Sequence, residues 1–304
     1  MKTSLKILKW LGITLVFVLI FGFIGFLIIN SRIESRISKT YEVSLNPLEI
    51  PSDSLTLALG KHLSVIKGCT DCHGSNFQGG FVINDPPVGV VYAPNLTKGK
   101  GGKIENYTEK DWIRSIKHGV NPTGKALWIM PSYEYDVLSE EDLVALISYV
   151  KSREPIDSEP VQNSLGPVGK VLLNFDKIHL LSAEKINHGP KEMVKKVKVE
   201  ETAAYGQYLI TSCIGCHRDD LKGGAPIAPG FPDVPNITLS GKLASYSDED
   251  FIKMMQKGIT PEGRQTDAKE MPWSMTKGFT DLEIKAILKY LKSLPDDKSI
   301  ASKS

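Results

Sequence analysis

The chain has 304 residues, with 37 Lys and Arg against 35 Asp and Glu, for a formal net charge of +2. A charge so nearly balanced gives no indication of nucleic-acid binding, which a strongly basic chain would suggest. The sequence holds only four cysteines and six histidines. Any repeated pattern among so few residues is therefore informative.

An uncharged apolar run near the N-terminus predicts a membrane anchor. Residues 11–29 form nineteen consecutive uncharged positions, which as a helix would span roughly 28 Å, close to a bilayer core. A cleavable signal peptide is the weaker interpretation, because the run exceeds a usual signal core and no small-residue cleavage site follows it. Basic residues flank the run on both sides, so they do not decide the orientation. We expect a stub over residues 1–10 and an anchor over residues 11–29.

All four cysteines belong to one pattern that occurs twice, as Cys69-Thr-Asp-Cys72-His73 and Cys213-Ile-Gly-Cys216-His217. The pattern C-x-x-C-H is the attachment signal for c-type haem. The two thiols add to the haem vinyl groups, and the histidine becomes the proximal iron ligand. Chance would give on the order of 0.001 such sites in this composition. The sequence therefore predicts two covalently bound haem c groups.

Three other interpretations of the cysteines are less favourable. A zinc ribbon also uses C-x-x-C pairs, but these pairs lie far apart in the sequence and each carries its own histidine. A thioredoxin-like redox pair would lie near a βαβ pattern, which the sequence does not show. A disulfide within each pair would leave the repeated histidine unexplained.

The sequence around the two motifs repeats with a period of about 141 to 144 residues, too long for a solenoid. Each copy has a Pro-Asn-(Leu/Ile)-Thr segment, two residues typical of helix N-caps, and a glycine suited to ending a helix. The matched residues are Pro94 and Pro235, Thr108 and Ser247, Gly119 and Gly258, and Ser139 and Thr280. Glu283 would complete a capping box with Thr280. The repeat predicts two copies of one helical domain.

This organisation assigns the rest of the chain. Residues 30–55 are expected to be a linker, 56–153 the first domain, 154–200 an interdomain linker, 201–295 the second domain and 296–304 a tail. Residues 168–175 are apolar enough to pack on a domain.

Met130 and Met271 are the expected sixth ligands of the two irons. Each lies nine residues before the N-cap of the last helix of its copy, and each is followed by proline. Proline disfavours helix at the preceding residue, so each methionine is expected on an extended loop. Met275 is a weaker candidate, because it aligns with Glu134 in the first copy. Packing would explain Met254 and Met255, which fall on a predicted helix.

The remaining histidines do not repeat between the copies, and we expect them to be solvated rather than ligating. They are His62, His118, His179 and His188.

With these motifs, both copies resemble class I cytochrome c domains. The resemblance implies an all-α fold, here an N-terminal transmembrane helix followed by two tandem domains. It also implies a close crossing of the first and last helices of each domain, where Gly60 would meet Tyr149 and Gly206 would meet Tyr290. In this family a backbone carbonyl supports the proximal histidine, and Pro94 and Pro235 are the candidates here.

More narrowly, the Pro-Asn-(Leu/Ile)-Thr and Met-Pro segments look like those of the cytochrome c subunits of membrane-bound alcohol and gluconate dehydrogenases. Those subunits carry three haems, whereas this chain has two C-x-x-C-H sites. The resemblance implies a single-pass protein of the bacterial inner membrane, with its haem domains on the periplasmic side. Its partners would be redox proteins: a membrane dehydrogenase, a quinol-oxidising complex or a terminal oxidase.

The function expected from these residues is transport of single electrons between a membrane donor and a periplasmic or oxidase acceptor, rather than catalysis. A role as the haem-bearing subunit of a membrane dehydrogenase or oxidase complex differs only in the partner. A dihaem peroxidase is disfavoured, because it needs one iron with an open or displaceable position, and both copies carry the Met-Pro pair.

Overall fold

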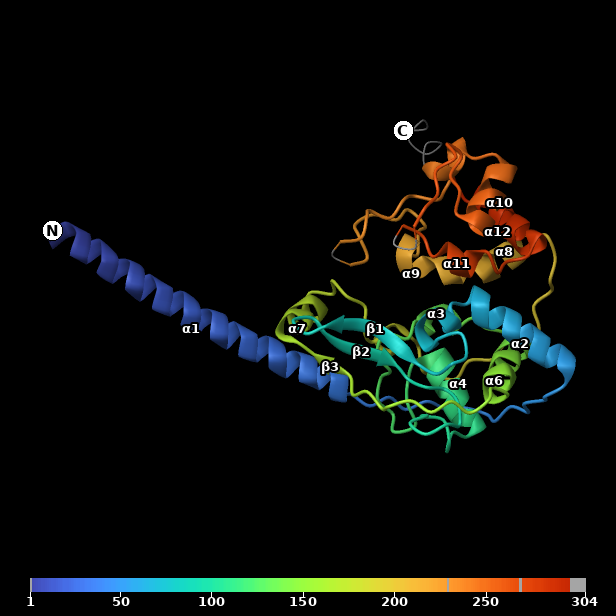
Figure 1. Cartoon of the computed structure of the whole chain (residues 1–304), viewed down its shortest axis with the longest axis horizontal. Coiled ribbons are helices and arrows are strands. Elements are labelled where there is room, and N and C mark those ends of the chain that lie inside the picture. The colour runs from blue at the N-terminus through green and yellow to red at the C-terminus, as the bar shows by residue number, and fades with distance from the viewer. Residues whose placement is uncertain (1, 229, 268–269, 296–304) are drawn as a thin grey trace.

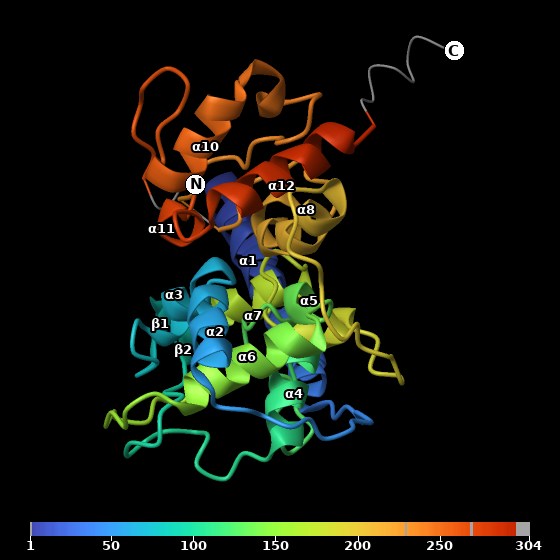
Figure 2. The same cartoon turned by 90° about the vertical axis from the view of Figure 1, so that its right-hand side faces the viewer.

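The computed structural model describes residues 2–228, 230–267 and 270–295, so the expected tail 296–304 lies outside the described residues. One long helix extends away from two packed helical domains, as Figure 1 shows. The second domain lies above the first in both Figure 1 and the view turned by 90° in Figure 2.

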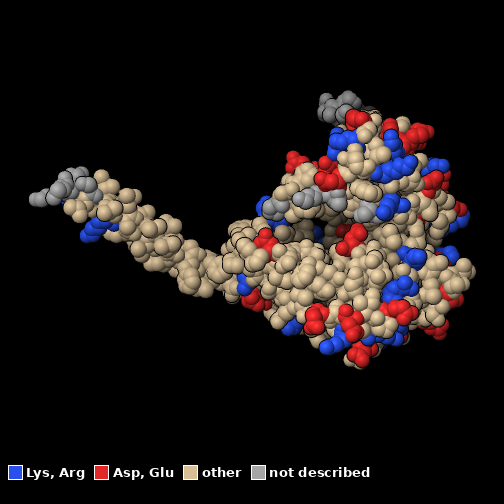
Figure 3. All heavy atoms as spheres, in the orientation of Figure 1, with Lys and Arg blue, Asp and Glu red and all other residues tan. Residues whose placement is uncertain are grey.

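Helix α1 is longer than the sequence predicted. It runs over Lys2–Ser38, 37 residues, and so includes most of the first ten residues and the start of the expected linker. Most of its apolar side chains between Leu5 and Ile28 are exposed. Figure 3 shows this length as an arm with almost no charged surface beyond the basic residues near its start. The helix is long and apolar enough to cross a membrane.

The C-terminal end of α1 packs firmly on the first domain. Ile33 is fully buried in a small apolar cluster there. The Arg36 guanidinium donates to both carboxylate oxygens of Glu184, at 3.0 and 2.6 Å, and to the Leu173 carbonyl at 2.8 Å. Lys170 donates to the side chain of Asn30 at 2.5 Å. The partners of α1 come from the expected interdomain linker, which folds against the first domain.

The elements of the first domain and the segment after it are α2 (Ser54–Ile66), α3 (Cys69–His73), β1 (Gly80–Asp85), β2 (Gly89–Ala93), α4 (Glu109–His118), α5 (Ser132–Tyr135), α6 (Glu140–Lys151), β3 (Ser164–Leu165), α7 (Pro167–Asn174) and η1 (Ser182–Lys185). The second domain contains α8 (Ala203–Leu209), η2 (Ile210–Cys213), α9 (Ile214–His217), η3 (Lys242–Ser245), α10 (Asp248–Lys257), α11 (Trp273–Thr276) and α12 (Asp281–Ser293). The expected helical architecture is confirmed.

The first and last helices of each domain cross in close contact. A Cβ atom added at Gly60 of α2 would lie 2.0 Å from the Ala145 carbonyl oxygen and 2.6 Å from the Tyr149 Cβ of α6. In the second domain, a Cβ atom at Gly206 would lie 2.0 Å from the Ala286 oxygen and 2.8 Å from the Tyr290 Cβ. The expected Gly–Tyr contacts are therefore confirmed. Only glycine allows the two backbones to approach this closely.

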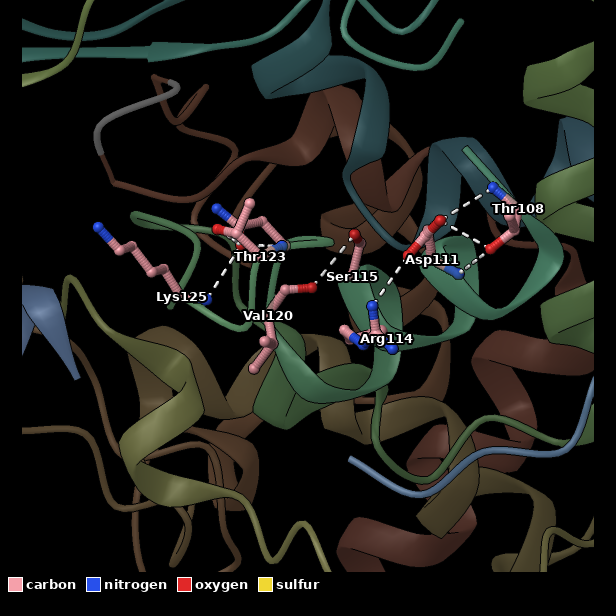
Figure 4. Close-up of polar contacts among 8 residues, drawn as sticks. Thr108, Asp111, Arg114, Ser115, Val120, Thr123 and Lys125 are labelled. Carbon is pink, nitrogen blue, oxygen red and sulfur yellow. Dashed lines mark hydrogen bonds and ion pairs between the residues drawn. The ribbon is translucent and has the colours of Figure 1, made fainter. Parts of the chain in front are cut away.

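The expected helix caps are also confirmed. Thr108 and Asp111 form a capping box at the start of α4, drawn in Figure 4, where Arg114 also pairs with Asp111 at 2.9 Å. Ser247 and Thr280 begin α10 and α12 with capping boxes, and Ser139 caps α6. Helices α4 and α10 end at Gly119 and Gly258, both left-handed, with φ of 62° and 66°. These caps satisfy backbone groups that each helix end would otherwise leave unpaired.

A small antiparallel sheet in the first domain adds to the helical fold and was not predicted. Strand β1 pairs with β2 from Gly80 opposite Ala93 to Asp85 opposite Gly89, and β3 pairs with the other edge of β2. Helix α7 packs beside this sheet, so residues 168–175 pack on the first domain as the sequence suggested. Pro94 follows directly after β2, so the sheet sets the position of its carbonyl group.

Two hydrogen bonds join the domains reciprocally. His62 of α2 lies 2.7 Å from the carboxylate of Glu283 at the start of α12. Tyr208 of α8 donates to the carboxylate of Asp142 at the start of α6, at 2.5 Å. In the sequence repeat His62 aligns with Tyr208, and Asp142 aligns with Glu283. In each domain, therefore, a residue of the first helix contacts the acidic residue at the start of the last helix of the other domain.

We predict that replacing Gly60 with alanine strongly destabilises the first domain. The new methyl group would overlap the Ala145 carbonyl oxygen, so α2 and α6 would have to separate. The expected loss is about 3 kcal/mol of the free energy of unfolding, measured by guanidinium denaturation followed by circular dichroism. Gly22→Ala is the matched control, because nothing lies within 4 Å of its added Cβ. Equal stability of the two variants would contradict the crossing.

Candidate functional site

The first C-x-x-C-H segment forms the short helix α3, which follows α2 after a left-handed Gly68 with φ of 69°. Cys69 and Cys72 are free thiols, each partly exposed. His73 Nδ1 lies 2.9 Å from the Pro94 carbonyl oxygen, which confirms the expected carbonyl. A carbonyl only accepts, so Nδ1 carries the hydrogen and Nε2 keeps a lone pair available for a metal.

The second segment repeats this arrangement. Cys213 ends η2, and α9 carries the segment through Cys216 to His217. His217 Nδ1 lies 2.9 Å from the Pro235 carbonyl oxygen, the same distance as in the first domain. Burial lowers the pKa of both His73 and His217, against the opposing effect of these hydrogen bonds. Both rings are thus neutral at neutral pH, the form that ligates a metal.

The cysteines do not resemble a redox pair. Burial raises the pKa of the Cys69 and Cys213 thiols to about 12 and also raises that of Cys72 and Cys216. Redox-active pairs have lowered thiol pKa values instead. Among the residues that the structure describes, no three His, Cys, Asp or Glu side chains gather as an ion site, so the two pairs do not converge as a zinc ribbon would.

A cavity of about 780 Å³ lies over the first segment. Its wall includes Cys69, Cys72 and His73, and also Met130. Aromatic and aliphatic side chains form much of the remainder, among them Phe77, Trp112, Leu127, Leu146 and Val150. The cavity thus brings together the predicted attachment residues and the predicted sixth ligand of the first domain.

A second cavity, of about 390 Å³, lies over the second segment. Cys213, His217 and Met271 are part of its wall, whereas Cys216 is not. Met254 and Met255 of α10 also line it, and Met255 is only 3% exposed. Met271 therefore shares this cavity with two methionines for which the sequence suggested packing alone.

Met275 does not contribute to the second cavity. It lines the first one, reaching across from the second domain, and its sulfur lies 3.3 Å from the position of a Cβ at Gly68. The sequence treated it as a weaker ligand candidate of its own domain. The short helix α11 turns it toward the other domain instead, as α5 does with the aligned Glu134.

None of the four other histidines lines either cavity, but the expectation that they are simply solvated was wrong for three of them: His62, His118 and His188. His62 pairs with Glu283 across the domain interface. His118 is 7% exposed, and its Nδ1 lies 3.2 Å from that of His188. Burial lowers the pKa of His118 to about 4. Tertiary packing, to which a single sequence gives no clue, explains all three.

Sequence reasoning missed the part played by the segment after the first domain. Residues 158–163, assigned to a linker, form part of the wall of the first cavity. They are held there by Asn95, which donates to the Ile156 carbonyl at 2.7 Å, and by Asn163, which accepts from the Tyr92 amide at 2.8 Å. The one sequence feature that pointed to this segment was the asparagine of Pro-Asn-(Leu/Ile)-Thr, Asn95, whose side chain binds it.

The residues present fit a covalently attached haem at each site. Each segment supplies two thiols and an imidazole with a free Nε2, and a methionine thioether lies in the largely apolar wall of the cavity beside it. This donor set is that of a c-type haem with His/Met ligation.

Comparison with known proteins agrees with this. A family model described as Cytochrome c matches residues 57–154 and 203–295. The gluconate 2-dehydrogenase cytochrome c subunit of Pantoea cypripedii is 35% identical over 274 residues, 77% of this chain and 58% of the relative. The cytochrome c subunit of a quinone alcohol dehydrogenase from Gluconacetobacter polyoxogenes is 27% identical over 282 residues, 80% of this chain and 57% of the relative.

A third relative is the cbb3-type cytochrome c oxidase subunit CcoP of Helicobacter pylori, 31% identical over 228 residues, 74% of this chain and 54% of the relative. The chain thus spans little more than half the length of these curated relatives. Because the family model covers both halves of the repeat, including both C-x-x-C-H segments, the chain belongs to the cytochrome c family and contains two of its domains.

Proposed function

We propose that this chain is a membrane-anchored dihaem cytochrome c that carries single electrons between redox partners. His73 and Met130 would be the axial ligands of the first iron, and His217 and Met271 those of the second. One observation carries the proposal. Each cavity contains the histidine of a C-x-x-C-H segment and the methionine of a Met-Pro pair at the same place in the repeat.

The residues around each site suit electron transfer. Haem bound there would supply a one-electron Fe(III)/Fe(II) couple. The Pro94 carbonyl holds the His73 ring in one orientation and one tautomer, which tunes a metal ligand. A thioether as second ligand favours the reduced state relative to a second histidine. If a histidine and a methionine hold each iron, no coordination position would remain for a substrate, so the proposed role is that of a carrier and not a peroxidase.

The loop carrying Met130 is held in an unusual conformation. Ile129 has a φ of +60°, rare for a β-branched residue. Its amide donates to the Leu180 carbonyl at 2.6 Å, and Ser182 donates to the Met130 carbonyl at 2.5 Å. Strained backbone persists only where the surroundings impose it and is common at functional sites. The interdomain segment therefore fixes the position of the methionine.

Partners and location follow from the relatives, which are named as subunits of dehydrogenases and of a cbb3-type oxidase. We infer that the donor or acceptor is a membrane dehydrogenase, a quinol-oxidising complex or a terminal oxidase. Helix α1 would span the bacterial inner membrane once and hold both haem domains on the periplasmic side. Native mass measurement after detergent solubilisation would distinguish a free carrier from a subunit of a complex.

The first prediction concerns the number of haems. Acid acetone should leave two porphyrin equivalents on each polypeptide, because thioether bonds survive denaturation. A variant with Cys69→Ser and Cys72→Ser should keep one, counted by intact mass. Thr70→Ser, between these cysteines, should keep both. Porphyrin that washes free of the wild-type chain would contradict covalent attachment.

A second prediction concerns the methionine ligands. Met130→Ala and Met271→Ala should each remove about half of the sulfur-to-iron charge-transfer absorbance of the oxidised protein, because each would remove one of two Met-ligated irons. Met254→Leu is the control for the second cavity, whose wall it shares with Met271. If Met254→Leu halves the band and Met271→Ala does not, Met254 is the ligand instead.

A third prediction concerns α1. The mature protein should keep this helix and remain in membranes after an alkaline carbonate wash. Cleavage near residue 30 would leave Ile33 and Arg36, which pack on the first domain, on a short N-terminal segment instead of a continuous helix. Intact mass measured on the membrane fraction tests this. A soluble chain that begins near residue 30 would instead identify the helix as a signal sequence.

A further inference from the structure

The two C-x-x-C-H segments meet at the domain interface. Lys67, two residues before Cys69, is 3% exposed, and its ammonium lies 3.4 Å from the hydroxyl of Thr211, two residues before Cys213. Aligned residues of the two copies are thus in contact. Figures 1 and 2 both show α11 of the second domain next to α2 and α3 of the first.

In each domain the short helix after the Met-Pro pair contacts the other domain. Helix α5 of the first domain reaches the second domain near η2, and α11 of the second domain reaches the first near α2. Their aligned residues, Glu134 and Met275, are each 8% exposed. Glu134 lies against the second C-x-x-C-H segment, and Met275 lies against the first. Glu134 also lines the first cavity, so it lies between the two sites.

The two C-x-x-C-H motifs differ at the residue before the second cysteine, where one has a carboxylate and the other has no side chain. Within the first motif, the residue before the second cysteine is Asp71; within the second motif it is Gly215. The Glu134 Oε1 lies only 2.4 Å from where a Cβ of Gly215 would be. The carboxylate of Glu134 therefore occupies, from the other domain, the space that a side chain at position 215 would take.

We propose that Glu134 gives the second haem site, from the neighbouring domain, the carboxylate that Asp71 gives the first site from within its own motif, and that this charge lowers the midpoint potential of the second haem. The inference rests on the proposed function, since it requires a haem in each domain. Glu134 would thus affect electron transfer through its charge and not as an iron ligand.

The physical argument is electrostatic. A negative charge stabilises Fe(III) relative to Fe(II), so the site beside a carboxylate gives up its electron more readily. In a medium of effective dielectric about 20, a unit charge about 10 Å away changes such an equilibrium roughly tenfold. In that oxidation the second iron would go from Fe(II) to Fe(III) and pass one electron to its redox partner. No proton or further reactant is needed.

The surroundings of Glu134 set the conditions for the test. Burial raises its pKa to about 7, against the opposing effects of a hydrogen bond with Tyr133 and the charges of Lys67 and Lys185. Tyr135 and the thiols of Cys72, Cys213 and Cys216 also feel its charge. Haem attachment would convert these thiols to thioethers, which do not titrate. Potentials should therefore be measured above pH 8, where the carboxylate is ionised.

The experiment is a spectroscopic redox titration of the full-length holoprotein in detergent. Glu134→Gln should raise the potential of the second haem by roughly 59 mV, a tenfold shift for one electron. It should also raise the potential of the first haem, because Glu134 lines the first cavity too. Asp71→Asn should raise the potential of the first haem. Glu249→Gln removes an exposed carboxylate of the second domain and should move neither. Unchanged potentials in Glu134→Gln, with two covalent haems present, would overturn the inference while leaving the proposed function intact. Fewer than two haems in the wild-type protein would refute the proposed function itself.

A rescue variant tests the position of the charge. Glu134→Ala vacates the space next to Gly215, whose backbone is helical, and Gly215→Asp then places a carboxylate in the motif itself, as Asp71 does. The double variant should return the shifted potential toward the wild-type value. A double variant that keeps two haems and stays at the Glu134→Gln potential would refute the assignment of the charge to this place. If it does not keep two haems, the Glu134→Gln titration alone decides.

Discussion

The close crossing of two helices in each domain is the constraint on which the rest of the structure depends. Gly60 and Gly206 leave no room for a methyl group beside the carbonyl oxygens of the helices that they cross. The crossing fixes where α2 and α8 end, and the C-x-x-C-H segments begin within a few residues of those ends. A shift of the crossing would move the thiols and the histidine relative to the methionine loop, which is attached to the other helix of the pair.

A second level of organisation comes from the contact between the two copies. His62 with Glu283 and Tyr208 with Asp142 use the cap acids of the last helices, so a group that begins a helix also joins the domains. Although burial opposes it, hydrogen bonds from His62 and Thr280 lower the pKa of Glu283, and Glu283 in turn raises the pKa of His62. This pair favours one fixed arrangement of the domains, because the Glu283 side chain is buried and would lose its partner if the pair were broken.

Much of this could be predicted from the sequence because the signals were local. The motif Cys69 to His73, the caps at Thr108 and Thr280 and the Met-Pro pairs each depend on a few neighbouring residues, and the repeat allowed one copy to check the other. The small sheet could not be predicted in this way, because β3 comes from a segment about 70 residues after β2. For the same reason the sequence did not show that residues 158–163 close the first cavity or that Met275 turns toward the opposite domain. These features depend on tertiary contacts between distant residues, which have no counterpart in local pattern.

The junction between α1 and the first domain has a mechanical consequence. A flexible linker after α1 would let the two domains adopt a wide range of orientations relative to the helix. Here Ile33 and Arg36 are part of both the helix and the domain packing, so tilting the helix tilts the domain with it. The first domain would thus keep a fixed orientation relative to the helix. A partner that approaches from a given side would always meet the same face, so the frequency of productive encounters would depend on the partner's position and not on rotation of the domains.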